Sequence, residues 1–167
     1  WVIAEGADAA GMNRSVPLSL ALDGAMVALY QNGEPLRRSQ GFPMRLLVPG
    51  CEGNLSVKWL RSLKLLDQPA QTREETSKYT DLRLDGKAAQ FSLRMQAKSV
   101  ITSPSGKMTL EQRGVYEING LAWSGNGSIR RVEVSADGGR SWADAMLQSE
   151  PGPMRSVGVR IPWRWQG

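Results

Sequence analysis

Glycine and proline occur throughout this chain at intervals that leave room mainly for short strands and turns. The 167 residues include eighteen glycines and nine prolines, which are scattered rather than clustered. Glycine supplies turn conformations and proline removes a backbone donor, so both residues end regular elements. Apolar residues make up 41% of the chain, and no run approaches the ~18 consecutive apolar residues of a membrane span. We expect a folded, turn-rich chain of one ordinary domain or two small ones.

The first half of the chain predicts a mixture of short strands and short helices. Ser15 and Pro17 are typical of a helix start, and this helix should run to about Leu22, before Gly24. Asn32-Gly33 is a strong signal for a two-residue turn. The strands that we expect here cover residues 26–31, 44–48, 55–60 and 63–66. A capping-box pattern at 72–75 predicts one further helical turn.

From about residue 91 the pattern indicates β-structure only. The expected strands cover residues 91–95, 98–102, 114–118, 121–124, 129–134, 143–146 and 156–161. Short strands at this spacing, separated by Gly, Pro, Asn or Ser, are typical of a sandwich. We therefore expect an α+β chain with a boundary near Ala97, giving domains at 1–97 and 98–167.

Composition excludes several classes of site. The chain contains no histidine, which removes a Ser-His-Asp triad and His-ligated zinc, iron or haem sites. One cysteine, Cys51, allows neither an internal disulfide nor a multi-cysteine metal site. The net charge of +5 comes from dispersed cations, whereas nucleic-acid binders more often concentrate theirs. A modest positive excess also suits a phosphate-bearing ligand or an oxyanion substrate.

Two cations stand out by their positions. Strand alternation over 55–60 would place Ser56 and Lys58 on one face, either towards a polar space or towards solvent. Arg45 lies in an otherwise apolar stretch, and a buried cation has to be paired. Its partner could be an anionic ligand, because guanidinium binds phosphate in a bidentate manner, or a carboxylate such as Glu52.

Three other features have simple structural interpretations. Residues 135–142 match the Asp-box pattern S-x-D-x-G-x-x-W, in which Asp137 and two glycines form a tight turn and Trp142 folds back. The lone Cys51 is more typical of a small buried hydrophobe than of a ligand or nucleophile. Tyr79 lies in a polar segment, where a phenol can donate a hydrogen bond to an oxyanion.

Taken in order, these segments resemble the sulfite oxidase family of molybdenum enzymes. The resemblance rests on Q-N-G-E-P-L at 31–36, Q-G-F-P-M-R-L-L-V-P-G at 40–50 and S-V-K-W-L at 56–60. Residues 100–104, 120–125 and 132–142 resemble the start of the family's immunoglobulin-like dimerisation domain. Within the family, 5–9 and 72–81 look closest to the molybdenum subunit of the sulfane dehydrogenase in bacterial thiosulfate-oxidising (Sox) systems.

The resemblance implies a role for individual residues. Residues that match the family's pterin-binding positions are Asp8, Gln40, Arg45, Ser56, Val57 and Lys58. Tyr79 matches the family's active-site tyrosine, near the oxo-molybdenum centre and the substrate. Gln40 replaces a histidine that many members have, so it can donate and accept hydrogen bonds but carries no charge. No residue of this chain matches the cysteine that ligates molybdenum, which we expect upstream of Trp1.

The resemblance also implies the wider setting of the chain. We expect part of a periplasmic oxidoreductase that uses molybdopterin to oxidise sulfite or protein-bound sulfane sulfur and reduces a c-type cytochrome subunit. A homodimer through the C-terminal domain and a sulfur-carrier protein or sulfur oxyanion as substrate would fit this setting. We expect the chain to be cut at both ends, and alone it should be inactive because the thiolate that ligates molybdenum is missing. The alternative is a non-catalytic β-sandwich binding module, which predicts no buried cation cluster; an Asp-box propeller would need several copies of that motif.

Overall fold

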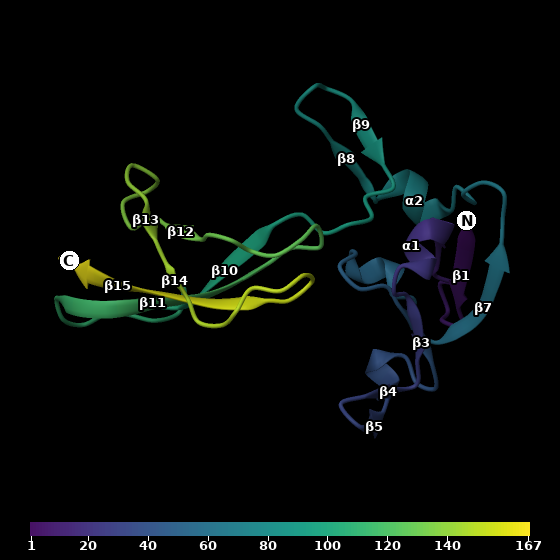
Figure 1. Cartoon of the computed structure of the whole chain (residues 1–167), viewed down its shortest axis with the longest axis horizontal. Helices are drawn as coiled ribbons and strands as arrows, with labels where there is room; N and C mark the ends of the chain where they lie inside the picture. The colour runs from purple at the N-terminus through teal and green to yellow at the C-terminus, as the bar shows by residue number, and fades with distance from the viewer. The chain divides into compact units, whose positions relative to one another are not determined.

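The computed structural model describes residues 1–167 and divides the chain into two compact units (Figure 1). Unit 1 comprises Trp1–Met95, and unit 2 comprises Gln96–Gly167. Antiparallel strands dominate both units, and the only two α-helices are one turn long. The expected α+β class is confirmed. No helix is long and apolar enough to cross a membrane.

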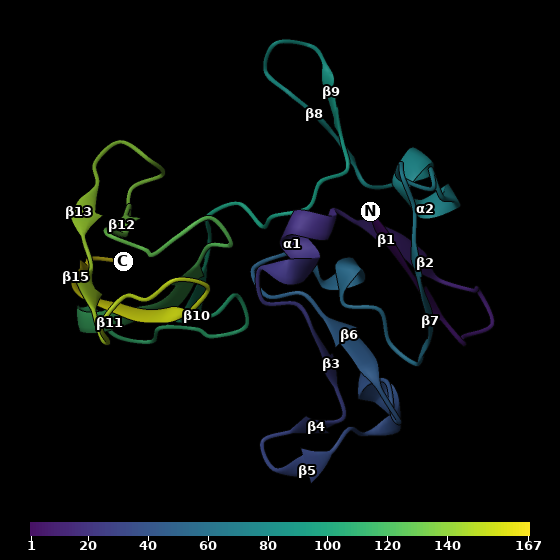
Figure 2. The same ribbon diagram turned by 45° about the vertical axis from the view of Figure 1, so that its right-hand side comes forward.

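Unit 1 is assembled from short elements, as the density of glycine and proline predicts. In chain order they are β1 (Val2–Gly6), β2 (Asn13–Val16), α1 (Leu18–Leu22), β3 (Met26–Ala28), β4 (Tyr30–Gln31), β5 (Glu34–Pro35), the 3₁₀ turn η1 (Arg38–Gln40), β6 (Arg45–Leu47), the 3₁₀ turn η2 (Gly53–Leu55), β7 (Leu60–Leu65), α2 (Arg73–Ser77), β8 (Thr80–Leu82) and β9 (Ala88–Gln90). The largest sheet has the order β2-β1-β7, and β3 pairs with β6. The β8–β9 hairpin extends away from the rest of the unit (Figure 2).

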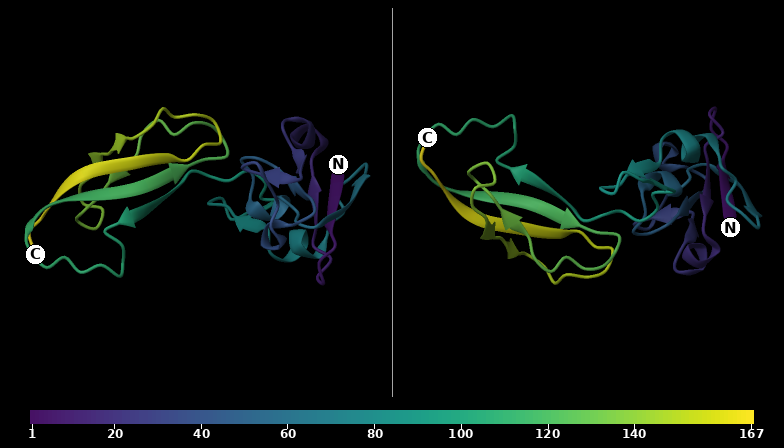
Figure 3. Two further views of the ribbon diagram at one scale, coloured as in Figure 1. Left: turned by 90° about the horizontal axis from the view of Figure 1, so that it is seen from below. Right: turned by 90° about the horizontal axis from the view of Figure 1, so that it is seen from above.

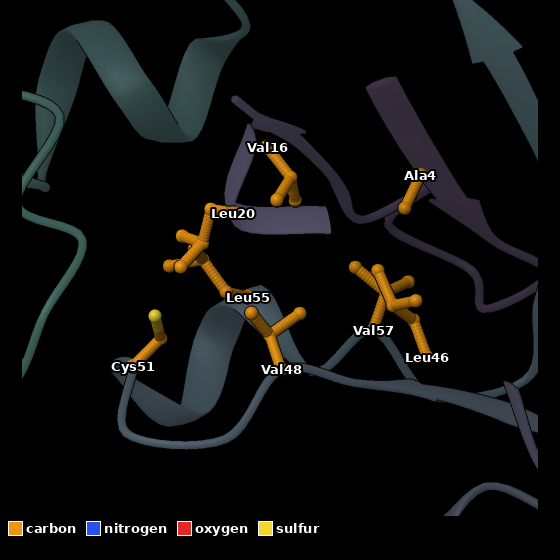
Figure 4. Close-up of a cluster of buried hydrophobic side chains, with 8 residues drawn as sticks. All are labelled: Ala4, Val16, Leu20, Leu46, Val48, Cys51, Leu55 and Val57. Carbon is orange, nitrogen blue, oxygen red and sulfur yellow. The ribbon is translucent and has the colours of Figure 1, made fainter. Parts of the chain in front are cut away.

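The core of unit 1 lies between the β2-β1-β7 sheet and the segment that contains β6 and η2. Its buried members are drawn in Figure 4: Ala4, Val16, Leu20, Leu46, Val48, Cys51, Leu55 and Val57. Apolar burial of this kind contributes roughly 25 cal/mol for each Å² removed from water. The expected interpretation of Cys51 as a small buried hydrophobe is confirmed, since it is a member of this cluster.

Two local predictions in unit 1 hold, and both depend on local turn chemistry. Asn32 and Gly33 have φ values of 53° and 82°, and they join β4 to β5 as a tight hairpin. The capping-box position at Thr72 starts α2, where Glu75 Oε2 accepts a hydrogen bond from the Thr72 backbone N–H at 3.0 Å.

Two other predictions in unit 1 are wrong. Ser15 does not cap a helix: it lies in β2, and α1 begins after Pro17 with no side-chain cap. Residues 55–60 do not form one strand, because η2 ends at Leu55 and Trp59 adopts a positive φ of 49°. The segment 56–60 instead runs beside β6, with Leu46 N–H donating to the Val57 carbonyl at 2.9 Å.

Unit 2 is a four-stranded antiparallel sheet with a short two-stranded ribbon. The strands are β10 (Lys98–Ser103), β11 (Gly114–Trp123), β12 (Glu133–Val134), β13 (Ala143–Asp144), β14 (Met146–Leu147) and β15 (Val157–Trp165). The sheet order is β10-β11-β15-β14, and β12 pairs with β13. The long strands β11 and β15 lie side by side over nine residue pairs (Figure 3).

The strands of unit 2 differ from the expected ones in number and length. Residues 114–118 and 121–124 were expected as two strands, but β11 runs continuously through Asn119 and Gly120. A Cβ at Gly120 would lie 2.7 Å from the Val100 carbonyl oxygen, so this glycine permits a close approach of β10 instead of a turn. Residues 91–95, which end unit 1, form no strand beyond an isolated bridge between Arg94 and Cys51.

Candidate functional site

Two basic side chains of unit 1, Arg45 and Lys58, reach the same short turn. Lys58 Nζ donates to the Ser39 carbonyl at 2.7 Å, and Arg45 Nη1 donates to the Gln40 carbonyl at 3.3 Å. These two carbonyls belong to consecutive residues of η1. The side chains of Arg45 and Lys58, which are thirteen positions apart in the sequence, therefore bond to the same turn, η1.

Neither cation has an anionic partner within the chain. The second Arg45 nitrogen, Nη2, donates to the Ser56 carbonyl at 3.1 Å, and the buried Nε has no hydrogen-bond partner. Glu52, the carboxylate considered from the sequence, instead accepts from Asn54 Nδ2 at 3.0 Å. Carbonyl dipoles solvate a cation without cancelling its charge, so the turn retains two positive charges that favour an anion.

Two glycines allow a close approach of the Lys58 backbone: Gly41, at the end of η1, and Gly6, in β1. Gly41 has a φ of 108°, and a Cβ there would lie 3.0 Å from Lys58 Cα. A Cβ at Gly6 would lie 2.7 Å from the Lys58 carbonyl oxygen. Real Cβ atoms do not come this close to backbone, so both positions require glycine for packing.

The other residues expected at a pterin site use their side chains within the protein. Ser56 Oγ accepts from the Val48 N–H at 3.1 Å, and the Val57 side chain lies in the core. The expectation that Ser56 and Lys58 share one face, towards either a polar space or solvent, is therefore wrong: the Ser56 side chain is buried and that of Lys58 is exposed. The Ser56 carbonyl nevertheless contacts Arg45.

Asp8 and Gln40 each stabilise a turn. Asp8 Oδ1 accepts from the Met12 N–H at 2.9 Å and closes the loop between β1 and β2. Gln40 Oε1 accepts from the Arg37 N–H at 3.3 Å at the start of η1. Arg45 thus bonds both Gln40 and Ser56, and Lys58 bonds Ser39, the residue next to Gln40, whereas no hydrogen bond joins Asp8 to any of them.

Tyr79 belongs to a separate cluster in unit 1. It follows α2, and its half-buried ring lies under the Arg14 guanidinium, with Arg14 Cζ 4.3 Å from the ring centroid. Arg14 is wholly buried, and none of its three side-chain nitrogens has a hydrogen-bond partner. Burial lowers the pKa of the Arg14 guanidinium from its ordinary value, and the Glu75 carboxylate opposes this effect.

Glu75 anchors this cluster. Its carboxylate is 0% exposed and lies 3.7 Å from Arg14 Nε as an ion pair. The same carboxylate accepts hydrogen bonds from the Ser15 N–H, from Ser15 Oγ at 3.2 Å and from the Thr72 N–H at 3.0 Å. Three protein donors and one cation therefore fix its position.

Arg14 and Glu75 were missed as site candidates from the sequence. Glu75 was recognised only as part of a capping box, and Arg14 lies in a four-residue strand, N-R-S-V, with no apolar alternation to mark it. Their contact joins residues 61 positions apart, so no local pattern could reveal it.

The remaining motifs are structural. Burial raises the pKa of the Cys51 thiol above its ordinary value, which makes the thiolate less available. The Asp137 carboxylate accepts hydrogen bonds from Arg140 N–H, Ser141 N–H and Ser141 Oγ within its turn, which lowers its pKa to about 2. No group of three or more His, Cys, Asp or Glu side chains could hold a metal ion.

Comparison with known proteins decides the family. Residues 1–74 match the family model described as oxidoreductase molybdopterin binding domain, and residues 89–166 match the Mo-co oxidoreductase dimerisation domain. The chain carries domains of the sulfite oxidase family. It is similar to the mitochondrial sulfite oxidase of Homo sapiens, with 33% identity over 163 residues that cover 91% of this chain and 29% of that protein. The sulfite oxidase of Gallus gallus is 33% identical, over 96% of this chain and 37% of its own length.

A solved structure of the sulfite oxidase family supports the same assignment. The crystal structure of the sulfane dehydrogenase SoxCD from Paracoccus pantotrophus matches with a TM-score of 0.91 and 47% identity, over 99% of this chain and 43% of that chain. The expected resemblance to the Sox enzyme is thereby confirmed. This chain spans less than a third of the human relative's length and less than half of the bacterial one. Membership of this family implies the molybdenum cofactor.

Proposed function

We propose that this chain is the part of a sulfur-oxidising molybdenum enzyme that binds the phosphate of the pterin and carries its active-site tyrosine. The observation that carries the proposal is the convergence of Arg45 and Lys58 on adjacent carbonyls of η1, without a carboxylate partner. A phosphorylated pterin supplies the missing negative charge, since the Arg45 guanidinium bonds only carbonyl oxygens and its buried Nε has no acceptor at all. The residues present therefore fit the cofactor that the family implies.

Each expected residue then has a specific task towards the cofactor. Arg45 and Lys58 hold the phosphate by charge-assisted hydrogen bonds. Ser56 and Val57 contribute through their backbones, because the Ser56 side chain bonds Val48 N–H and the Val57 side chain packs in the core. Gln40 contributes an amide next to the phosphate site.

Asp8 and Tyr79 act away from the phosphate. Asp8 shapes the loop after β1, through which the pterin is held. When bound, the cofactor supplies a molybdenum centre that accepts two electrons from a sulfur compound. Tyr79 is half-buried with its phenol able to donate a hydrogen bond to an oxyanion, so it orients the sulfur substrate. The net positive charge of the chain attracts an anionic substrate.

The whole enzyme that we propose is periplasmic, acts on sulfite or protein-bound sulfane sulfur, and passes electrons to a c-type cytochrome subunit. SoxCD, at 47% identity, supports the sulfur chemistry. The dimerisation-domain match supports a homodimer through unit 2, for which we propose an immunoglobulin-like arrangement. The isolated chain should be inactive, because its single cysteine is buried in the apolar core and offers no thiolate to molybdenum.

The phosphate site can be tested with inorganic phosphate as the probe. Phosphate should raise the melting temperature of the chain, since a ligand at a hundred times its Kd stabilises by about 2.7 kcal/mol. Arg45→Gln and Lys58→Gln should each reduce this shift. Lys64→Gln, which changes an exposed lysine of β7, should leave it unchanged. A wild-type chain that does not respond, or a response kept in both site variants, would refute the proposal.

The predicted inactivity has its own test. The chain 1–167 should show no turnover with sulfite or thiosulfate and cytochrome c, and measurable turnover would contradict the inactivity. The non-catalytic binding module considered from the sequence predicts no buried cation cluster. The buried Arg14 and half-buried Arg45 count against that alternative.

A further inference from the structure

A buried cation with no hydrogen-bond acceptor is unusual. Arg14 is such a cation, because none of its three buried side-chain nitrogens has a hydrogen-bond partner. Buried charges normally gain hydrogen bonds that offset their desolvation. Two groups lie against its guanidinium and stabilise its charge: the Glu75 carboxylate, 3.7 Å from Nε, and the Tyr79 ring, whose centroid lies 4.3 Å from Cζ. The Glu52 and Glu74 carboxylates also attract the Arg14 charge, but less strongly than Glu75. Arg14 therefore lies in contact with both Glu75 and the Tyr79 ring.

The position of Arg14 depends on the strand that carries it. In the antiparallel register Arg14 pairs with Ala4, so its side chain emerges on the core face of the β2-β1-β7 sheet beside Val16. The small Ala4 side chain leaves room for the guanidinium. Glu75 is held by three protein donors, so it fixes the guanidinium from the far side.

Tyr79 is the only member of this arrangement that is not fully buried. Arg14 and Glu75 are both 0% exposed, whereas the Tyr79 ring is half-buried and reaches the surface of unit 1. A cation over an aromatic face is attracted by the ring quadrupole, and the attraction is greatest where the cation is desolvated. The buried pair can thus hold the plane of a ring that is itself partly exposed.

We propose that Arg14 is a positioning residue that fixes the orientation of the Tyr79 phenol, with Glu75 fixing Arg14 in turn. This inference rests on the proposed function only for the role of Tyr79 towards substrate. Arg14 acts through Tyr79 and does not touch the substrate, because its side chain is fully enclosed by the protein. Lysine would keep the charge but would lose the planar stacking on the ring.

The first test observes the ring itself and needs no cofactor. The chain has three tyrosines, so ¹³C-labelled tyrosine gives three ring signals, with the exposed Tyr30 and the unit 2 residue Tyr116 as internal references. In Arg14→Met the Tyr79 signal should move towards that of Tyr30, and in Arg14→Lys it should move less. Arg61→Met removes an exposed cation paired with Glu5 at 3.8 Å and should leave all three signals in place.

The second test uses the full-length enzyme. Arg14→Met should lower kcat 10- to 100-fold with little change in KM, and Arg14→Lys should recover part of the loss. On a Tyr79→Phe background, Arg14→Met should cause no further loss, because a positioning residue acts only through the group that it holds. An unchanged Tyr79 signal in Arg14→Met, an equal change in Arg61→Met, or additive kinetic losses would overturn the inference. A Tyr79 signal that responds in an enzyme without sulfur-oxidising activity would refute the proposed function while leaving the Arg14–Tyr79 contact intact.

Discussion

Replacing Glu75 by glutamine tests how much of the stability of unit 1 depends on one buried carboxylate. Glu75→Gln keeps the shape of the side chain but leaves Arg14 as a buried cation without a partner. At 3.7 Å and an effective dielectric constant of about 20, Coulomb's law gives about 4.5 kcal/mol for the pair. Measured losses for breaking one side of a buried pair are about 3–5 kcal/mol. We therefore expect unit 1 to lose about 3–5 kcal/mol, a large share of the total for a domain.

The assay has to report on each unit separately. Native-state hydrogen exchange does this, because the Leu46 N–H donates to Val57 within unit 1 and the Ala145 N–H donates to Val132 within unit 2. Glu75→Gln should lower the exchange free energy of Leu46 and leave that of Ala145 unchanged.

Two comparisons decide whether the buried charge is the cause. Glu74→Gln removes the neighbouring carboxylate, whose partners Arg73 and Lys78 are mostly exposed, so its effect should be much smaller. Combining Arg14→Met with Glu75→Gln should restore at least half of the lost stability, because no unpaired buried charge remains. The reasoning is refuted if Glu75→Gln and Glu74→Gln are equally destabilising, or if the double variant is no more stable than Glu75→Gln.

Three further outcomes follow from the structure. Cys51 should react with a thiol reagent at least ~100-fold more slowly in the native chain than in urea, because the side chain is buried and the pKa of its thiol is raised. Equal rates would show that the Cys51 thiol is accessible in the native chain. The pKa of Asp137 is depressed to about 2 against about 3.9 in an unfolded chain, so its contribution to stability is present above pH 4 and is lost as the pH falls through 2. The difference in melting temperature between wild type and Asp137→Asn should therefore shrink from pH 5 to pH 2, and a constant difference would contradict this. Gly41→Ala should destabilise unit 1 by about 1–2 kcal/mol because of the positive φ at this position, with a further loss from contact with Lys58. The same change should weaken phosphate binding. Gly53→Ala is the control, since no atom lies within 4 Å of the added Cβ, and it should change phosphate binding little.

Features that depend on a few consecutive residues were predictable from the sequence. The Asn32-Gly33 hairpin turn and the helix start at Thr72 follow from backbone conformations that those residues favour. Arg45 was recognised because a cation in an apolar stretch needs a partner, and the structure gives it carbonyls but no carboxylate.

Features that depend on distant contacts were not predictable. Ser15 has a good helix-capping side chain, but its backbone N–H and hydroxyl both bond Glu75, sixty residues away, and this keeps it in β2. The strand expected at 55–60 is interrupted where Lys58 closely approaches Gly6 and Gly41 and Trp59 adopts a positive φ, and these approaches involve residues distant in the sequence. Gly120 lies between the two strands expected at 114–118 and 121–124, yet it sits inside β11 and permits a close approach of β10. A glycine marks either a turn or a close contact, and only the neighbouring chain decides which.

The two cation clusters of unit 1 are stabilised in opposite ways, which fits the binding role proposed for one and the positioning role proposed for the other. Arg45 and Lys58 bond only to carbonyl oxygens, so an incoming phosphate can compete for their donors without leaving a carboxylate unpaired. Arg14 is fully buried, so an external anion cannot reach it. Its positive charge is already compensated by the Glu75 carboxylate. Salt screens exposed charges far more than buried ones, so the first cluster should respond to ionic strength and the second should not. A cation that binds a ligand has to remain available, whereas a cation that holds a side chain in place has to be fully committed within the protein.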